Sequence, residues 1–112
     1  MNLPLSDRIE VTRCMASVNS GRRPLLVGGG GFGVKEVLQF IDAVSTEKIT
    51  GVHVIPFDGK IDSKAIGRFY KSIADQSPVP IWLYQNTARS PGLPIDLVEE
   101  LSYHPNIHGA KI

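Results

Sequence analysis

The chain has 112 residues and a mass of 12.2 kDa, and its 42% hydrophobic and 21% charged residues are typical of one small globular domain. Twelve Lys and Arg residues against eleven Asp and Glu leave a formal charge of +1, which lacks the basic excess of most nucleic-acid-binding proteins. A single cysteine excludes an internal disulfide, and neither a transmembrane run of roughly 18 apolar residues nor a signal peptide is found. We therefore expect a cytoplasmic protein with no nucleic-acid partner and no membrane partner.

Helices and strands are predicted to alternate along the chain. The first element is a helix from about Ser6 to Val18, with Ile9, Met15 and Val18 facing inward. Short apolar runs that follow a turn signal or a proline predict strands at Pro24–Val27, Gly51–Pro56, Val79–Tyr84 and Asn106–Ile112.

Apolar residues between these strands recur with helical spacing. The first stripe consists of Val34, Val37, Leu38, Ile41 and Val44. The second consists of Ala65, Ile66, Phe69, Tyr70 and Ile73, with Ser63 as the predicted N-cap. In the third helix Pro94 suits the first turn, and Leu97, Val98 and Leu101 are predicted to be buried.

This alternation predicts an α/β fold with a parallel sheet and right-handed crossovers. Either a compact open sheet or part of a (β/α)₈ barrel fits such a pattern. The predicted strands start 27 or 28 residues apart, and eight such units would make about 220 residues, near the lower end of the barrel range. We therefore predict that residues 1–112 form a single partial (β/α)₈ TIM barrel of about four βα units.

The glycine-rich segment Gly28–Gly33 follows a predicted strand and precedes a predicted helix. Its glycines match the G-x-G-x-x-G pattern of a phosphate-binding turn. A dinucleotide-binding fold would place an acidic residue about 20 positions later, whereas Asp58 lies 25 residues beyond Gly33. A tight strand-to-helix turn explains the same glycines. A nucleotide-binding open α/β module therefore remains an alternative function.

Lys111 lies at the carboxyl end of the last predicted strand, the end that carries the active site in a barrel. Among small and apolar neighbours a lysine loses hydration, which favours the neutral amine. That amine can attack a ketone and form a Schiff base. A lysine that simply points to solvent is the alternative interpretation.

Tyr84 ends the preceding predicted strand, so a parallel sheet would bring its phenol close to Lys111. The phenol could relay protons during imine formation. Arg89 follows in the next loop, where its guanidinium could bind a substrate carboxylate through two hydrogen bonds. A tyrosine that caps the core and a solvated loop arginine are the alternatives. Together the three residues predict a site for a 2-keto acid.

The histidines do not have metal-binding spacing. His53 lies within a predicted strand as a core or pocket residue, and His104 precedes Pro105 in a turn, while His108 lies in the last strand. We expect neither a metal nor a cofactor.

With these residues the sequence resembles the dihydrodipicolinate synthase and N-acetylneuraminate lyase family of class I aldolases, over nearly its whole length. Leu5-Ser6-Asp7-Arg8 is similar to the family's L-S-x-x-E-R helix start, and Gly21–Gly28 to its G-R-x-P-V-I-x-G strand. Tyr84 matches the tyrosine of the Y-N-x-P motif, and Gly109-Ala110-Lys111 matches the G-I-K segment.

The resemblance implies that the chain covers helix 2 through strand 6 of the family barrel. It implies that Lys111 forms a Schiff base with pyruvate or a related 2-keto acid, that Tyr84 is catalytic and that Arg89 binds substrate. It also implies a lyase that works as a homo-oligomer without a cofactor.

Two segments depart from the family pattern. The tyrosine motif reads Tyr84-Gln85-Asn86-Thr87, and the loop that usually offers a second tyrosine reads Pro56-Phe57-Asp58-Gly59. In addition, the family's G-T-T/S-G-E segment, which binds the pyruvate carboxylate, would precede Met1. We therefore leave the substrate open, including a sugar-derived keto acid, and keep an inactive truncated fragment as a further alternative.

Overall fold

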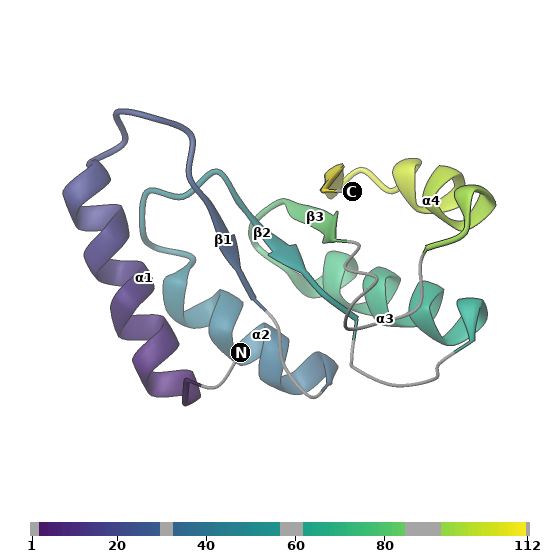
Figure 1. The fold of residues 1–112 in the computed structure, drawn as a ribbon, viewed down its shortest axis with the longest axis horizontal. Coiled ribbons are helices and arrows are strands. Elements are labelled where there is room, and N and C mark those ends of the chain that lie inside the picture. The colour runs from purple at the N-terminus through teal and green to yellow at the C-terminus, as the bar shows by residue number, and fades with distance from the viewer. Residues whose placement is uncertain (1–2, 30–32, 57–61, 85–92, 112) are drawn as a thin grey trace.

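The computed structural model describes residues 3–29, 33–56, 62–84 and 93–111. Helices and strands alternate from the first element to the last (Figure 1). In chain order they are α1 (Leu5–Asn19), β1 (Leu26–Gly28), α2 (Val34–Val44), β2 (Gly51–Val54), α3 (Ser63–Gln76), β3 (Ile81–Tyr84), α4 (Ile95–Ser102) and β4 (Ile107–Lys111). Among the described residues, no helix is long and apolar enough to cross a membrane.

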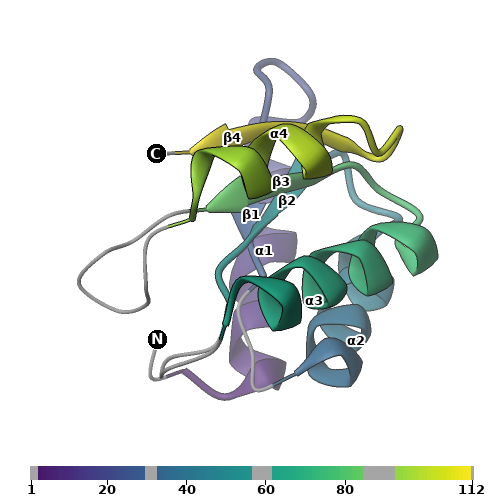
Figure 2. The same cartoon turned by 90° about the vertical axis from the view of Figure 1, so that its right-hand side faces the viewer.

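The four strands form one parallel sheet in the order β1-β2-β3-β4. This confirms the predicted α/β alternation and the parallel sheet. Because strand order follows chain order, successive crossovers move in one direction across the sheet, as in a (β/α)₈ barrel, whereas a doubly wound open sheet reverses its order. The helices pack on their chain neighbours, α1 on α2, α2 on α3 and α3 on α4, and Figure 2 shows α2 and α3 together below the sheet.

The core lies between the sheet and the helices. Alternate strand residues point into it, and six of them are buried: Val27, Val52, Val54, Ile81, Leu83 and Ile107. From the helices, Phe40, Ile41, Ile66, Ile73 and Leu101 meet them. Complete burial of such a side chain contributes about 1.5–3 kcal/mol, so this layer supplies most of the apolar stabilisation.

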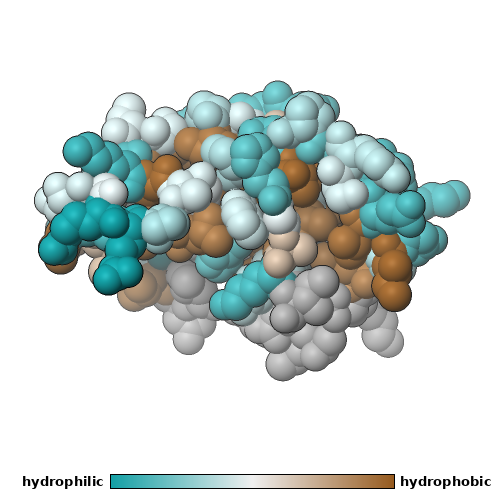
Figure 3. Space-filling model, turned by 90° about the horizontal axis from the view of Figure 1, so that it is seen from above, coloured by the Kyte–Doolittle hydropathy of each residue, from teal (hydrophilic) through white to brown (hydrophobic). Residues whose placement is uncertain are grey.

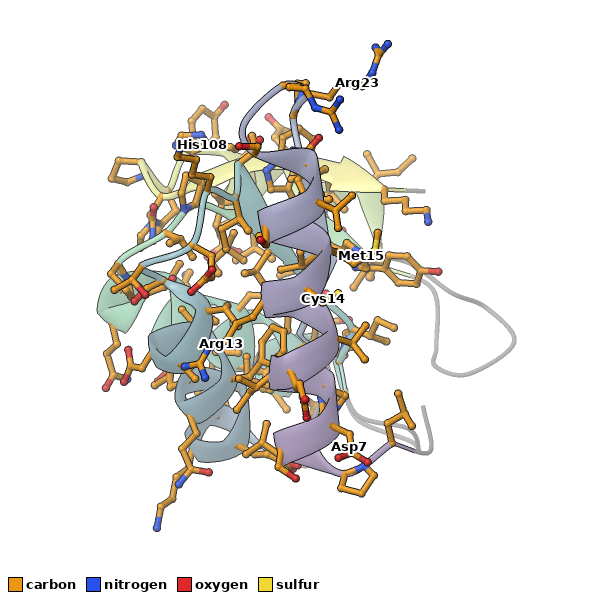
Figure 4. The ribbon with its side chains drawn as sticks, turned by 90° about the vertical axis from the view of Figure 1, so that its left-hand side faces the viewer. Asp7, Arg13, Cys14, Met15, Arg23 and His108 are labelled. Atoms are coloured by element: carbon orange, nitrogen blue, oxygen red, sulfur yellow. The ribbon has the colours of Figure 1, made fainter. Side chains whose placement is uncertain are left out.

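The predicted inward face of the first helix is wrong for Met15 and Val18, which are 55% and 69% exposed. α1 instead buries Arg8, Thr12 and Ala16. Arg8 pairs with Glu36 on α2 at 3.1 Å, and its guanidinium lies 5.8 Å from the centre of the Phe40 ring. A polar anchor thus decides which side of α1 meets α2. Figure 4 shows Arg13 beside α2 and Met15 on the side of α1 turned away from it.

The N-cap predicted at Ser63 is also wrong by one residue. Asp62 precedes α3, and its carboxylate accepts a hydrogen bond from the Ala65 N–H at 2.7 Å. An aspartate oxygen satisfies one of the unpaired N–H groups at a helix start, so Ser63 becomes the first helical residue. Pro94, predicted in the first turn, is instead the N-cap residue of α4. Leu97 and Leu101 are buried as predicted, whereas Val98 is half-buried.

The second face of the sheet carries a different set of residues. Its residues alternate with those of the core: the side chains of Leu26, His53, Trp82, Tyr84 and Lys111, together with glycines at positions 28, 51 and 109. Figure 3, seen from above, shows apolar surface between polar side chains on this side of the molecule. This face would line the interior of a closed barrel, and it carries both Tyr84 and Lys111.

Candidate active site

A β-bulge sets the register that brings Tyr84 and Lys111 together. Ile81 pairs with Ile107, but Trp82 pairs with Gly109, so β4 holds one residue more than β3 over this stretch. From there Tyr84 pairs with Lys111. Because alternate residues of a strand point to opposite faces, the extra residue puts Lys111 on the same face as Tyr84.

The Lys111 ammonium lies over the Tyr84 ring, with Nζ 5.0 Å from the ring centre. Both residues end their strands, as expected, so the pair lies at the carboxyl edge of the sheet. Tyr84 is half-buried and Lys111 is exposed, because within the described residues β4 pairs only with β3. The apolar surroundings expected for Lys111 are therefore not provided by this part of the structure.

His53, on β2, flanks Tyr84 from the other side of β3. The two rings are stacked, with centres 5.1 Å apart and planes 22° apart. Burial, with the nearby charge of Lys111 as a second cause, lowers the pKa of His53 below its usual 6.5. The imidazole is therefore neutral at neutral pH. Tyr84 lies between this imidazole and the Lys111 side-chain nitrogen.

Tyr70 holds the backbone of Tyr84 from the core side. Its buried hydroxyl donates to the Val54 carbonyl at 2.5 Å and accepts from the Tyr84 N–H at 3.4 Å. One side chain on α3 thereby joins the carboxyl ends of β2 and β3. Burial raises the pKa of Tyr70 well above its usual range, so the hydroxyl keeps its proton for this bond.

The remaining predicted site residues fall mainly outside the described structure. Arg89, Asp58 and residues 30–32 of the glycine-rich segment lie there. Gly33 has φ 155° and ψ 175° immediately before α2, a conformation that is almost restricted to glycine. A Cβ at position 29 would lie 2.6 Å from Val52 Cγ1, so close packing explains this glycine as well. These observations favour the tight turn over a nucleotide site.

A shallow basic hollow lies at the opposite, amino end of the sheet. It is lined by Gly21–Pro24 and Lys48–Thr50, and Arg22 there donates to the Asn19 and Val18 carbonyls at the end of α1. It shares no residue with the Tyr84–Lys111 pair. Over the described parts of the chain, His, Cys, Asp and Glu side chains nowhere gather in a group that could hold a metal ion.

Sequence reasoning did not assign His53 to the site and treated Tyr70 only as a core residue. The alternation in β2, with buried Val52 and Val54 on either side of His53, could have placed His53 on the Tyr84 face. The bond from Tyr70 joins residues 14 and 16 positions apart, and the sequence contains no local signal for it.

Comparison with known proteins matches the full chain to one family. The sequence model described as the Dihydrodipicolinate synthetase family matches residues 1–112. A 4-hydroxy-tetrahydrodipicolinate synthase of Leuconostoc mesenteroides is 34% identical over 97% of this chain and 39% of its own length. A 4-hydroxy-tetrahydrodipicolinate synthase of Oenococcus oeni is 31% identical over 94% of this chain and 37% of its own length. The chain therefore spans about two fifths of the length of these relatives.

Solved structures show the same fold. The 4-hydroxy-tetrahydrodipicolinate synthase of Methylacidiphilum fumariolicum SolV superposes with a TM-score of 0.91 and 24% identity, over 99% of this chain and 38% of that chain. Dihydrodipicolinate synthase from Acinetobacter baumannii, described as complexed with pyruvate, superposes with a TM-score of 0.90 and 24% identity. This superposition covers 98% of this chain and 38% of that chain. The four βα units described here are thus a partial (β/α)₈ barrel.

Proposed function

The chain belongs to the dihydrodipicolinate synthetase family, and on that premise we propose that Lys111 forms a Schiff base with pyruvate or a related 2-keto acid in a lyase reaction. The observation that carries this proposal is the position of Lys111 Nζ over the Tyr84 ring at the carboxyl edge of two paired strands. In a (β/α)₈ barrel this edge is where catalytic residues gather.

The two residues divide the chemistry of imine formation. The neutral Lys111 amine attacks the ketone carbon, the nitrogen gives up one of its protons and the carbonyl oxygen takes up a proton, which gives a carbinolamine. Loss of that hydroxyl as water, with loss of the remaining N–H proton, leaves the imine. Lys111 Nζ lies 5.0 Å from the centre of the Tyr84 ring, and this supports a role for the Tyr84 phenol in delivering and removing these protons, which is general acid–base catalysis.

Two observations bear on the substrate. The curated relatives are named as 4-hydroxy-tetrahydrodipicolinate synthases, and one superposable enzyme was crystallised with pyruvate. This chain has Gln85-Asn86-Thr87 after Tyr84, and its loop that in the family usually offers a second tyrosine reads Pro56-Phe57-Asp58-Gly59. We therefore propose a pyruvate-type keto acid as the imine-forming substrate, with Arg89 as a carboxylate ligand, and include a sugar-derived keto acid among the candidates. A cytoplasmic homo-oligomer is the expected form.

Borohydride reduction with pyruvate tests the proposal. The protein at its full natural length is incubated with pyruvate, reduced, digested and examined by peptide mass spectrometry. We expect one reduced pyruvate on Lys111 and no adduct in Lys111→Ala. Lys35→Ala, which removes an exposed lysine on α2, should still form the adduct. An adduct that survives Lys111→Ala, or no adduct in the wild-type protein, contradicts the proposal.

A further inference from the structure

His53 has no part in the chemistry proposed above, yet it touches the residue at the centre of it. Its ring is stacked on Tyr84 at 5.1 Å, and it lies one strand away from Tyr84, on the face that also carries Lys111. Three aligned strands thus contribute one side chain each, in the order His53, Tyr84 and Lys111.

Packing, rather than hydrogen bonding, holds the imidazole in place. His53 Nδ1 is buried and has no hydrogen-bond partner among the described residues. The ring lies directly over Gly28, where an added Cβ would be 3.1 Å from His53 Cε1. The absence of a side chain at Gly28 therefore leaves the space that the imidazole occupies between β1 and Tyr84.

The surroundings keep this ring neutral. An imidazolium has two N–H donors, and an unpaired buried donor on a charged group is costlier than one on a neutral group. The ammonium of Lys111 acts in the same direction, and both effects lower the pKa of His53. His53 therefore presents a flat, uncharged aromatic ring to Tyr84 and does not add a second cation beside Lys111.

We infer that His53 is a positioning residue, which holds the Tyr84 ring in the orientation that places its phenol for proton transfer at Lys111. The inference rests on the proposed function, because Tyr84 has a proton to relay only if Lys111 forms an imine. The aromatic ring of His53, and not its nitrogen atoms, is what the role requires. Misplacement of a reacting group by about 1 Å can lower a rate about 100-fold. Removal of the His53 ring should therefore lower the rate of imine formation measurably.

A pair of substitutions separates the ring from its nitrogens. His53→Phe keeps an aromatic ring, and His53→Asn keeps a polar amide without one. Each variant, at the full natural length of the protein, is assayed by the rate of borohydride-trapped adduct at increasing pyruvate. We expect His53→Asn to lower the saturating rate about 10- to 100-fold with half-saturation unchanged, and His53→Phe to stay within about threefold of wild type. His108→Asn, at an exposed histidine on β4, is the matched control.

Ring NMR of the three tyrosines provides a second measurement that does not depend on activity. The Tyr84 ring signals should shift in His53→Asn and stay near their wild-type positions in His53→Phe. Equal loss of rate in both variants would show that the nitrogens matter and would overturn the inference, as would an unchanged rate in His53→Asn. If the wild-type protein forms no adduct, the proposed function fails. Unchanged Tyr84 ring signals in His53→Asn would overturn the positioning role of His53, whatever the outcome for the proposed function.

Discussion

The indole of Trp82 lies so close to the backbone of Gly109 that a Cβ at position 109 would overlap the six-membered ring. The two residues are register partners on β3 and β4, next to the bulge that precedes Lys111. On its other side Trp82 approaches Gly51, where a Cβ would lie 3.1 Å from the indole Cδ1. Glycines on both neighbouring strands thus make room for one large side chain beneath the Tyr84–Lys111 pair.

Gly109→Ala should destabilise the protein by about 1–3 kcal/mol, because the rigid indole must move or the strands must separate. The free energy of unfolding in urea measures this. In a double-mutant cycle with Trp82→Leu, the alanine should cost much less, since the overlapping ring is gone. An equal cost of Gly109→Ala in both backgrounds would show that the indole does not impose the glycine.

Tyr70→Phe should lower the free energy of unfolding by about 1–3 kcal/mol, since it leaves the buried Val54 carbonyl without the hydroxyl donor. Tyr103→Phe removes the same atom from a side chain that is 78% exposed and should change stability by less than about 0.5 kcal/mol. Urea unfolding of both variants makes the comparison. Similar effects of the two substitutions would mean that the Tyr70 bond contributes little.

His53 should make stability depend on pH. Its pKa is lowered in the folded protein by burial and by Lys111, and the Tyr84 ring also faces it, so the unfolded chain takes up the proton first as pH falls. The resulting stability is present above about pH 6.5 and is lost as pH falls through the folded pKa. Thermal unfolding between about pH 7.5 and 5 should show a smaller decrease in His53→Phe than in wild type or His108→Asn. Identical slopes would contradict this assignment.

Tyr84→Phe should still form the adduct on Lys111, but about 10²- to 10⁴-fold more slowly, the usual contribution of a general acid–base group. The ring is kept, so the stack with His53 should persist, and only the proton relay is removed. Single-turnover trapping with pyruvate measures the rate, with Tyr103→Phe as the control. A wild-type rate in Tyr84→Phe would remove Tyr84 from the proposed chemistry.

The 112-residue chain should associate with further copies of itself through α1. Val11, Met15 and Val18 are 53%, 55% and 69% exposed and recur at a spacing that puts them on one side of a helix. Burial of such a stripe against a second copy is favourable at about 25 cal/mol per Å². Met15→Glu with Val18→Glu should shift sedimentation toward the monomer, whereas Lys64→Glu, at an exposed position on α3, should not. A monomeric wild-type chain at high concentration would contradict this prediction.

Local patterns were enough to predict the alternation of helices and strands, because each element buries one face and its apolar period shows which kind it is. The parallel direction followed from the alternation of strands and helices, and the strand ends at Tyr84 and Lys111 predicted a shared edge. Apolar spacing failed to predict the buried face of α1. There a partly buried Arg8–Glu36 pair, and not the apolar stripe that contains Met15, faces α2. Charge pairs between elements have no period that a single helix can reveal.

The sequence by itself determined the elements, the parallel α/β sheet and the shared edge at which Tyr84 and Lys111 end their strands, because these depend on local periodicity and on chain length between strands. Only the tertiary structure decided which face Lys111 takes, since the additional residue of the β4 bulge reverses the parity of every residue after it. The tertiary structure also decided that His53 stacks on Tyr84 and that the Tyr70 hydroxyl accepts a hydrogen bond from the Tyr84 N–H on β3. Those contacts join separate elements, and they depend on register and side-chain direction, which are fixed only when the elements pack.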